Sequence, residues 1–573
     1  MKRLVLSALL LFTAFAQSDP FVDAEASRLE TQTLEDFQTP TGRERRRQEA
    51  LEMFGLAPMP ARGDLRATIT GRVEDESVVV EKLHYQSSPG LYVTANFYLP
   101  KKVTKPLPTV LYVCGHAEVK TNGISYGNKT AYAHHGAWFA QNGYACLIID
   151  TLQLGEIQGI HHGTYREGMW WWNSRGYSSA AVEAWNSIRA LDYLETRPEV
   201  DKARIGVTGR SGGGAYSWSL IALDPRVKAA APVAGITDLH NHVIDGTVEG
   251  HCDCMFFVNT YAWDYPMLAA CAAPRPLLIV NSDKDSIFPL DGVIRLHKKV
   301  ADLYRALNAT NDLGLVIGPG PHKDTQELQV PVFRWFNHYL RGEEPLIDMA
   351  ATRHFTPQQL RVFDKLPADQ KNTTVQEWFV PKAPPGPKIT DAGQWERQRE
   401  EWMRSLREKV FRNWPKRYSP PLTKGFLRSS SSGDFKASDP RPIGSLGNRA
   451  QVQLRRRYML VGHTIDSMRV YDLVQAINGL PQANISLEAE GDMAVNVLFA
   501  SLFVDKVKRL RLKNLPASIE QGPDYLNVLR VLDLREALAL ALERASIELE
   551  SSKADSGYAR EIGRQLGWET TIK

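Results

Sequence analysis

The sequence predicts an α/β protein, with a mostly parallel, doubly wound sheet followed by a second, smaller α/β block. Between residues 67 and 345, short β-like runs such as TVLYVCG, ACLIID and PLLIVNS alternate with segments of 3.6-residue apolar periodicity. This alternation is typical of a parallel sheet with helices on both faces. It resumes after residue 449. The 573 residues leave room for several domains, at about 100 to 200 residues each.

The first residues have the order of a secretory signal peptide. Lys2 and Arg3 precede an apolar run, which closes in the small-x-small triplet Ala-Phe-Ala. This order predicts a leader of residues 1–16, cleaved after Ala16, and therefore a secreted or periplasmic protein. The apolar run is too short to cross a bilayer, so we expect no membrane anchor.

Charge and cysteine content narrow the class of protein further. A formal net charge of +4 over the whole chain is too small to indicate a nucleic-acid partner. The five cysteines are an odd number and few for an exported chain, which argues against a disulfide scaffold. Nothing in the sequence indicates an oligomeric state.

The remaining boundaries follow from changes in pattern along the chain. Residues 17–66 are charged and helical in pattern, and we expect an N-terminal helical extension there. Residues 67–345 contain the first strand–helix block. Residues 346–448 are rich in proline and serine and contain a tryptophan-rich helical stretch, which predicts a partly helical connector. Residues 449–573 form the second block.

The stretch VTGRSGGGAYS, residues 207–217, lies between a strand-like run and a helical pattern. Glycines at 209 and 213 frame Ser211 in the Gly-x-Ser-x-Gly pattern of a nucleophile elbow, where a sharp turn exposes the serine. A phosphate-binding loop is the alternative. Neither the dinucleotide fingerprint nor a terminal Gly-Lys-Ser/Thr is present. The pattern therefore favours a reactive Ser211.

Two further residues complete a catalytic triad in chain order. Asp285 follows the strand-like run PLLIVNS, and His322 follows LGLVIG in the loop GPGPHKD. Serine, acid and histidine, each just past the end of a strand, form the constellation that acyl transfer requires. We expect His322 to accept the Ser211 proton and Asp285 to orient the imidazole. Asp283 remains an alternative acid.

Acyl transfer also needs amide donors for the oxyanion of the tetrahedral intermediate. One is predicted to be the N–H of Gly212, directly after the nucleophile. The second should come from the loop after TVLYV, where Cys114-Gly115-His116 makes the amide of His116 the first candidate.

The elbow, APRPLLIVNSDKDSIFP and GPGPHKDTQ together resemble the acetyl xylan esterase group of secreted α/β-hydrolases, relatives of the prolyl-oligopeptidase-like hydrolases. The resemblance covers residues 68–345. It implies an α/β-hydrolase fold and cofactor-free ester hydrolysis, with an acetylated polysaccharide or oligosaccharide such as xylan as the substrate. The sequence departs from the pattern at Cys114-Gly115, where relatives often have His-Gly.

The second block repeats the first without its catalytic residues. RIGVTGRSGGGAYSW aligns with NISLEAEGDMAVNVL at an offset of 280, which puts Gly491 opposite Ser211. A second pair of segments, DYPMLAACAAPRPLLIVNS and DLREALALALERASIELES, aligns at an offset of 269. Continued further along the chain, this offset puts Ala554 opposite Asp285, with Asp555 next to it. No counterpart of His322 follows. We therefore expect residues 449–573 to be a degenerate, catalytically inactive relative of the first block. It would support the first block, cover its active site or recognise the substrate.

Three consecutive tryptophans, Trp170, Trp171 and Trp172, lie shortly before the helix that precedes the elbow. Their rings could stack on sugars, which makes them candidate substrate-binding residues. They could equally pack in the core or against the connector.

The stretch LHNHVIDGTVEGHCDC is rich in residues that ligate metals, namely His240, His242, His251, Cys252 and Cys254. Imidazoles and thiolates are zinc ligands, but this spacing matches no zinc motif. We therefore expect no metal here, and interpret the stretch as a loop beside the active site.

Two other functions remain possible. A serine peptidase of the prolyl-oligopeptidase type would use the same fold and triad, but no propeller repeat precedes the hydrolase block. A non-catalytic carbohydrate-binding protein could also retain the fold, although Ser211, Asp285 and His322 argue against it.

Overall fold

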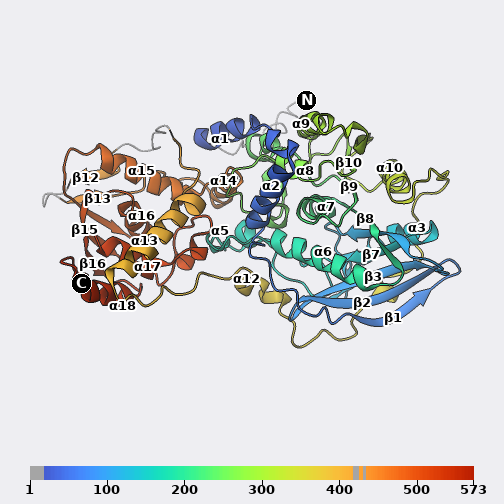
Figure 1. Cartoon of the computed structure of the whole chain (residues 1–573), viewed down its shortest axis with the longest axis horizontal. Helices are drawn as coiled ribbons and strands as arrows, with labels where there is room; N and C mark the ends of the chain where they lie inside the picture. Colours follow the sequence, from blue (N-terminus) through green and yellow to red (C-terminus); the bar gives the residue numbers. More distant parts are fainter. Residues whose placement is uncertain (1–18, 417–424, 430–433) are drawn as a thin grey trace, which may run out of the picture.

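The computed structural model describes residues 19–416, 425–429 and 434–573. The predicted signal peptide, residues 1–16, lies outside the described residues. Among the residues that are described, no helix has both the length and the apolar character needed to span a membrane. Two large sheets occupy separate halves of the molecule, on the right and the left of Figure 1.

The larger sheet has nine strands in the order β1-β2-β3-β7-β4-β8-β9-β10-β11. The first three strands are antiparallel, and the six strands from β7 to β11 run parallel to one another. The predicted mostly parallel sheet is thus confirmed. The strands are β1 (Thr68–Glu74), β2 (Val78–Ser88), β3 (Leu91–Pro100), β4 (Leu107–Val113), β7 (Ala145–Ile149), β8 (Val200–Arg210), β9 (Ala229–Val233), β10 (Leu277–Ser282) and β11 (Leu313–Gly318).

Both faces of this sheet are covered, because successive side chains of its central strands enter different cores. In β4, Leu111 and Val113 join a core with helices α6 to α9, whereas Val110 and Tyr112 join another with α3 and α10. A doubly wound sheet buries apolar residues on both sides in this way. The covering helices are α3 (Ala133–Gln141), α6 (Ser179–Thr196), α7 (Gly212–Leu223), α8 (Tyr265–Ala270), α9 (Leu290–Ala306) and α10 (Gln326–Phe336).

The N-terminal extension contains two helices, α1 (Pro20–Glu30) and α2 (Pro40–Met53). Each begins at a proline that follows a capping side chain, Asp19 for α1 and Thr39 for α2. Proline suits the first helical position because it lacks the N–H that would have no partner there. Both helices contribute buried residues to the core of the first block, and α2 crosses that block in Figure 1.

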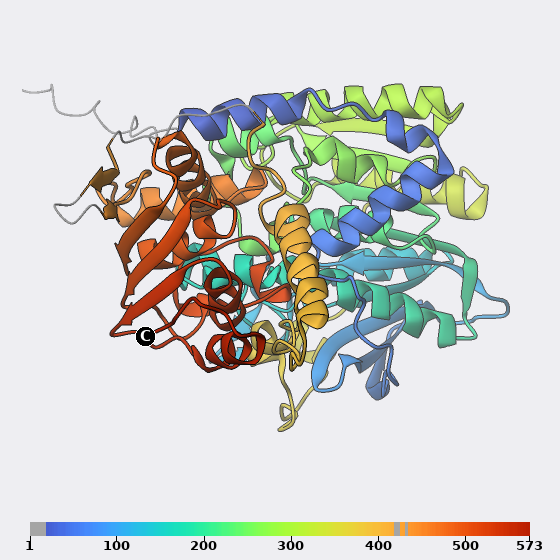
Figure 2. The ribbon, with the colours of Figure 1, turned by 60° about the vertical axis from the view of Figure 1, so that its left-hand side comes forward.

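The second sheet has five strands in the order β12-β13-β14-β15-β16, and β13 to β16 are parallel. A separate core lies between this sheet and its helices. Figure 2 shows α13 standing where the two halves meet. The strands are β12 (Leu427–Ser429), β13 (Phe435–Ala437), β14 (Ile485–Glu490), β15 (Val507–Lys513) and β16 (Ser546–Glu550). The helices are α13 (Ala392–Ser405), α14 (Asn448–Leu460), α15 (Ile465–Gly479), α16 (Asp492–Ser501), α17 (Leu534–Leu542) and α18 (Gly557–Leu566).

The two blocks repeat one another at the level of strand register. Gly206 pairs with Ala229 in the first sheet, and Ser486 pairs with Arg509 in the second. The offset of 280 therefore holds across the paired strands. At the turn that follows, Ser211 has φ 61° and ψ −119°, and Gly491 has φ 59° and ψ −132°. The second block retains the elbow backbone with glycine in place of the nucleophile.

The second predicted offset needs a correction of one residue. Leu277 pairs with Ala230 in the first sheet, and Ile547 pairs with Leu510 in the second, so the strands correspond at an offset of 270. The helices before these strands still correspond at an offset of 269, because Asp264 is the N-cap of α8 and Asp533 is the N-cap of α17. The second block thus has one more residue between this cap and the strand.

The corrected offset puts Asp555 opposite Asp285. Each carboxylate accepts the N–H two residues further along, at 2.8 Å for Asp555 and 2.9 Å for Asp285. The second block therefore retains a counterpart of the acid, whereas its elbow has no nucleophile.

Helix α14 belongs to both halves of the molecule. Its residues Leu454, Tyr458 and Leu460 are buried in the core of the first block. Arg455 of α14 donates a hydrogen bond to Asp524 of the second half at 2.6 Å, and the Asn173 side chain from the first block donates to the same carboxylate at 2.6 Å. The two halves thus share a packed interface.

Deleting residues 449–573 is expected to leave the first block insoluble. The deletion removes α14 and exposes the apolar side chains beneath it, and large exposed apolar patches cause aggregation. The soluble fraction and the thermal unfolding of the fragment measure this effect. A soluble, cooperatively unfolding fragment that has lost activity only on polymers would instead favour substrate recognition by the second block.

Candidate active site

Ser211 lies at the sharp turn between β8 and α7, as the elbow pattern predicts. Its positive φ of 61° is strained for a residue with a side chain. The chain passes so close to β4 that a Cβ at either Gly209 or Gly213 would lie 2.1 Å from the Val113 carbonyl oxygen. Glycine is therefore required at both positions, and the turn holds Ser211 at the carboxyl end of the sheet.

His322 lies between Ser211 and Asp285. Its Nε2 atom is 2.8 Å from Ser211 Oγ, and its Nδ1 atom is 2.6 Å from Asp285 Oδ2. Burial alone would raise the pKa of Asp285, but hydrogen bonds from His322 and from two backbone N–H groups outweigh it and hold that pKa below its usual value. The carboxylate is thus kept charged beside the imidazole.

Asp283, the alternative acid, lies elsewhere. Its carboxylate is exposed and accepts the N–H of Gly320 at 2.7 Å. This bond helps to fix the loop that carries His322. The geometry therefore favours Asp285 over Asp283 as the partner of the imidazole.

Ser211 and His322 line one cavity of about 290 Å³. Its wall also includes residues from the loop that carries Cys252, which lies beside the site as expected. The lining residues are His116, Tyr132, Arg210, Ser211, Gly250, His251, Cys252, Met255, Ile287, Phe288 and His322.

The two predicted oxyanion donors lie close to the nucleophile. Gly212 is the first residue of α7, where an N–H has no acceptor within the helix. A Cβ on Gly115 would lie 3.3 Å from Ser211 Cβ, so the turn that leads into His116 packs directly against the nucleophile. The His116 ring packs against Gly212. The loop that carries His116 and the start of α7 thus lie next to Ser211.

The tryptophans are at the junction of the two halves and do not line this cavity. The Trp172 side chain is fully buried against Tyr177, which excludes it from stacking on a sugar. The Trp170 ring lies 3.8 Å from the Arg455 guanidinium of α14, and Trp171 lies near Arg175. In these positions the three side chains have packing roles.

The histidines that approach Cys252 and Cys254 differ from those grouped with them in the sequence. His240 lies 3.1 Å from Glu30 on α1, and burial lowers the pKa of His242 to about 3. His251 is buried in the cavity wall, and its ring lies against Phe288 with 4.8 Å between the ring centroids. None of these three contacts a cysteine thiol within the described part of the chain.

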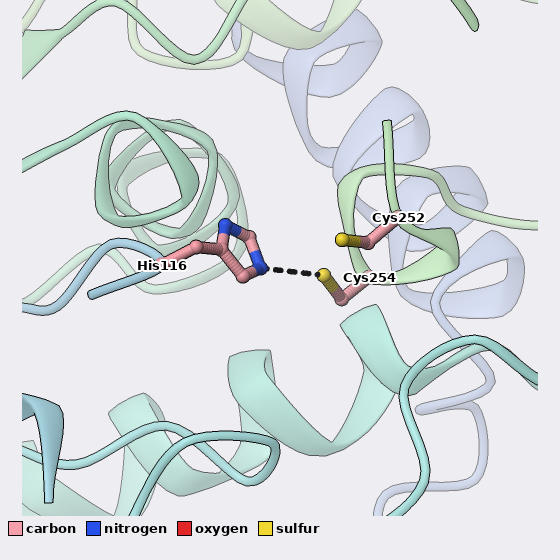
Figure 3. Close-up of side chains that lie close together, drawn as sticks. All are labelled: His116, Cys252 and Cys254. Atoms are coloured by element: carbon pink, nitrogen blue, oxygen red, sulfur yellow. Dashed lines mark hydrogen bonds between the residues drawn. The ribbon is translucent and has the colours of Figure 1, made fainter. Parts of the chain in front are cut away.

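Three other histidines, His116, His161 and His162, surround the two thiols. The His116 ring faces Cys254 (Figure 3), and its Nε2 atom lies 3.2 Å from Cys254 Sγ. His162 Nε2 lies 3.5 Å from Cys252 Sγ. Hydrogen bonds from Cys254 and from the histidines hold the pKa of Cys252 far below its usual range. Sequence spacing could not reveal this cluster, because three separate loops contribute to it.

Arg456 of α14 braces the loop that carries these cysteines. Its buried guanidinium donates to the carbonyls of Val248 and His251 at 2.9 and 2.7 Å, and lies 3.4 Å from Asp253. The second half of the chain therefore supports a wall of the cavity.

Arg456→Met is expected to lower the free energy of unfolding by about 3 kcal/mol, because it leaves buried acceptors without a donor. Denaturant unfolding measures the loss. Arg449→Met on the same helix is the matched control. Its side chain is 79% exposed and meets Glu249 at 3.3 Å, so less than about 1 kcal/mol should be lost. Equal losses in both variants would contradict the bracing role.

Comparisons with known proteins agree with this architecture. Residues 123–308, which include Ser211 and Asp285, match the model of the dienelactone hydrolase family. YtaP of Bacillus subtilis (strain 168), named as a hydrolase, is 25% identical over 304 residues, which are 52% of this chain and 100% of YtaP.

Two solved structures are similar in part. Methylesterase BT1017 is 22% identical with a TM-score of 0.44, over 56% of this chain and 68% of that chain. A glucuronoyl esterase from Solibacter usitatus is 17% identical with a TM-score of 0.41, over 51% of this chain and 91% of that chain. Residues 123–308 thus resemble a dienelactone hydrolase family domain, and the larger sheet with its helices has the α/β-hydrolase fold.

Proposed function

We propose that the protein is a serine carboxylesterase that removes acyl groups, above all acetyl groups, from a plant polysaccharide such as xylan. The observation that carries the proposal is the position of His322, 2.8 Å from Ser211 Oγ and 2.6 Å from Asp285. The leader of residues 1–16 would direct the enzyme to act outside the cytoplasm. N-terminal sequencing of exported protein, expected to begin at Gln17, tests that part.

Hydrolysis proceeds in two steps through an acyl-enzyme. Ser211 Oγ attacks the ester carbonyl carbon while His322 Nε2 takes its proton, and Asp285 stabilises the imidazolium. The amides of Gly212 and His116 hold the oxyanion, and each such donor contributes about 10²- to 10³-fold in kcat. His322 then protonates the sugar oxygen as its bond to the carbonyl carbon breaks, which releases the sugar with a free hydroxyl. The same groups next activate a water molecule, which attacks the acyl-enzyme and releases the acid.

The cavity favours a small acyl group. At about 290 Å³ it lies at the lower limit of ligand pockets, about 300 to 1,000 Å³, and cannot enclose a polymer. An acetyl group would enter the cavity while the sugar chain remains outside.

Acetate release from acetylated xylan and from a small acetyl ester tests the proposal, with cleavage of a prolyl peptide measured in parallel. The wild-type protein should release acetate from both esters. Ser211→Ala, the negative control, should release none above background. Peptide cleavage without ester turnover would replace the proposal with a serine peptidase, and no turnover of any substrate would favour a carbohydrate-binding role.

A further inference from the structure

A cluster of thiols and imidazoles lies in the wall of the active-site cavity. His116 comes from the loop after β4. His161 and His162 come from the loop between β7 and α4 (Gly163–Arg166), and Cys252 and Cys254 come from the segment after β9. The ligand atoms of His116, Cys252 and Cys254 lie within 4.8 Å of one another, as do those of His161, His162 and Cys252. Cys252 is common to both groups.

We propose that this cluster is a zinc site formed by His116, Cys252, Cys254 and one histidine of the His161–His162 pair. Zinc prefers four tetrahedral ligands, with thiolate sulfur at about 2.3 Å and imidazole nitrogen at about 2.0 to 2.1 Å. Such a shell puts neighbouring sulfur and nitrogen atoms about 3.5 Å apart by tetrahedral geometry. The measured separations are 3.2 Å between His116 and Cys254 and 3.5 Å between His162 and Cys252.

The donor set determines the kind of metal and its role. Two thiolates and two imidazoles select zinc over magnesium or calcium, which prefer oxygen ligands. Four protein ligands leave no open position for water, so the ion is structural rather than a Lewis acid for the ester. On binding, the thiols lose their protons and ligate as thiolates.

The scaffold around the cluster is already fixed by Asp253, between the two cysteines. Its carboxylate accepts the Thr164 hydroxyl and N–H at 2.8 Å each and the Tyr165 N–H at 3.1 Å. These bonds tie the cysteine segment to the residues that directly follow His161 and His162. The ligands from the two loops are thereby held together before a metal arrives.

The ion would also fix the oxyanion loop, a consequence that rests on the proposed function. The ring of His116 packs so closely on Gly212 that a Cβ there would lie 2.5 Å from His116 Cε1. A metal on His116 Nε2 would therefore hold the loop against the residue after the nucleophile. His116 acts in this respect as a positioning residue.

Zinc binding by the reduced full-length chain tests the site. After removal of metals, the protein is titrated with Zn²⁺ and its zinc content is measured after gel filtration. Co²⁺ is then substituted, and thiolate-to-cobalt charge transfer is followed by absorption. We expect one ion per chain with tetrahedral thiolate spectra. Cys252→Ser, Cys254→Ser and His116→Ala should each weaken binding by more than about 100-fold, the upper range for changes outside the ligand shell.

Two variants are matched controls. Cys271→Ser changes a buried thiol outside the cluster, which donates a hydrogen bond to the Met267 carbonyl at 3.5 Å. His240→Ala removes a histidine of the same segment as Cys252 and Cys254. Both should bind zinc as wild type does. Loss of binding in either His161→Ala or His162→Ala identifies the fourth ligand, and loss in neither overturns the four-ligand site.

Other outcomes also overturn the proposal. The proposal is overturned if the wild-type protein takes up no zinc, or if the cysteine variants bind zinc as tightly as wild type does. It is also overturned if a Cys252–Cys254 disulfide persists in zinc-containing buffer. Ser211→Ala should bind zinc normally, so failure of the metal site and failure of the esterase mechanism are distinguishable. In His116→Ala the backbone amide remains, and we expect kcat to fall while KM is unchanged.

Discussion

Ser211→Ala is expected to lower kcat for ester hydrolysis by about 10⁶-fold, the loss measured when the nucleophile of a comparable triad is removed. Alanine can adopt the backbone of Ser211 but provides no oxygen to attack the carbonyl. Acetate release under substrate saturation measures the effect. Thermal unfolding should be nearly unchanged, since the serine side chain is only half-buried and borders the cavity.

The second elbow, at Gly491, provides a matched control within the same chain. Gly491 has the backbone conformation of Ser211, and a Cβ added there meets no atom of the described residues within 4 Å. Gly491→Ser should therefore fold. The double variant Ser211→Ala/Gly491→Ser should remain inactive, because the one histidine of residues 449–573, His463, packs against Phe21 of α1. Restored turnover would contradict the assignment of a single working elbow, and unchanged activity in Ser211→Ala would overturn the nucleophile itself.

Asp285→Asn is expected to lower kcat by about 10⁴-fold, the effect of the equivalent change in a serine protease triad. Asparagine preserves the shape of the side chain, but its neutral amide no longer stabilises the imidazolium of His322. It also permits the wrong tautomer of the imidazole. Steady-state kinetics on a small acetyl ester measure the loss.

Asp283→Asn is the control for this prediction. Asp283 belongs to the same loop but bonds to the Gly320 N–H and not to His322. The amide oxygen of asparagine can still accept that N–H, so kcat should change by less than about tenfold, or about 1.4 kcal/mol. A larger loss in Asp283→Asn than in Asp285→Asn would make Asp283 the acid of the triad.

Much of this site could be predicted from the sequence, because its determinants are local or topological. Glycines at 209 and 213 are required where the turn crosses β4, and they identify the elbow without any knowledge of distant contacts. Asp285 and His322 follow neighbouring parallel strands, whose carboxyl ends meet at one edge of the sheet. Chain order alone therefore predicted that Ser211, Asp285 and His322 would meet.

The repeat could be predicted for a similar reason. An offset of 280 runs without interruption from β8 through the elbow into β9 and is reproduced in the strand pairing. The single extra residue after Asp533 was not detectable, because few identities constrain the alignment and only hydrogen-bonded register reveals the shift to Asp555.

Only the tertiary structure revealed the contacts between loops that are distant in the sequence. Trp170 to Trp172 proved to lie at the junction with α14, which no local pattern indicates. The thiols of Cys252 and Cys254 are approached by His116, His161 and His162 rather than by the histidines nearest in sequence. The sequence by itself determined the fold, the elbow and the order of the triad, because backbone sterics and strand topology act over short range. The choice of Asp285 over Asp283 and the thiol–imidazole cluster required the folded chain, because side-chain contacts between separate loops have no fixed spacing in sequence.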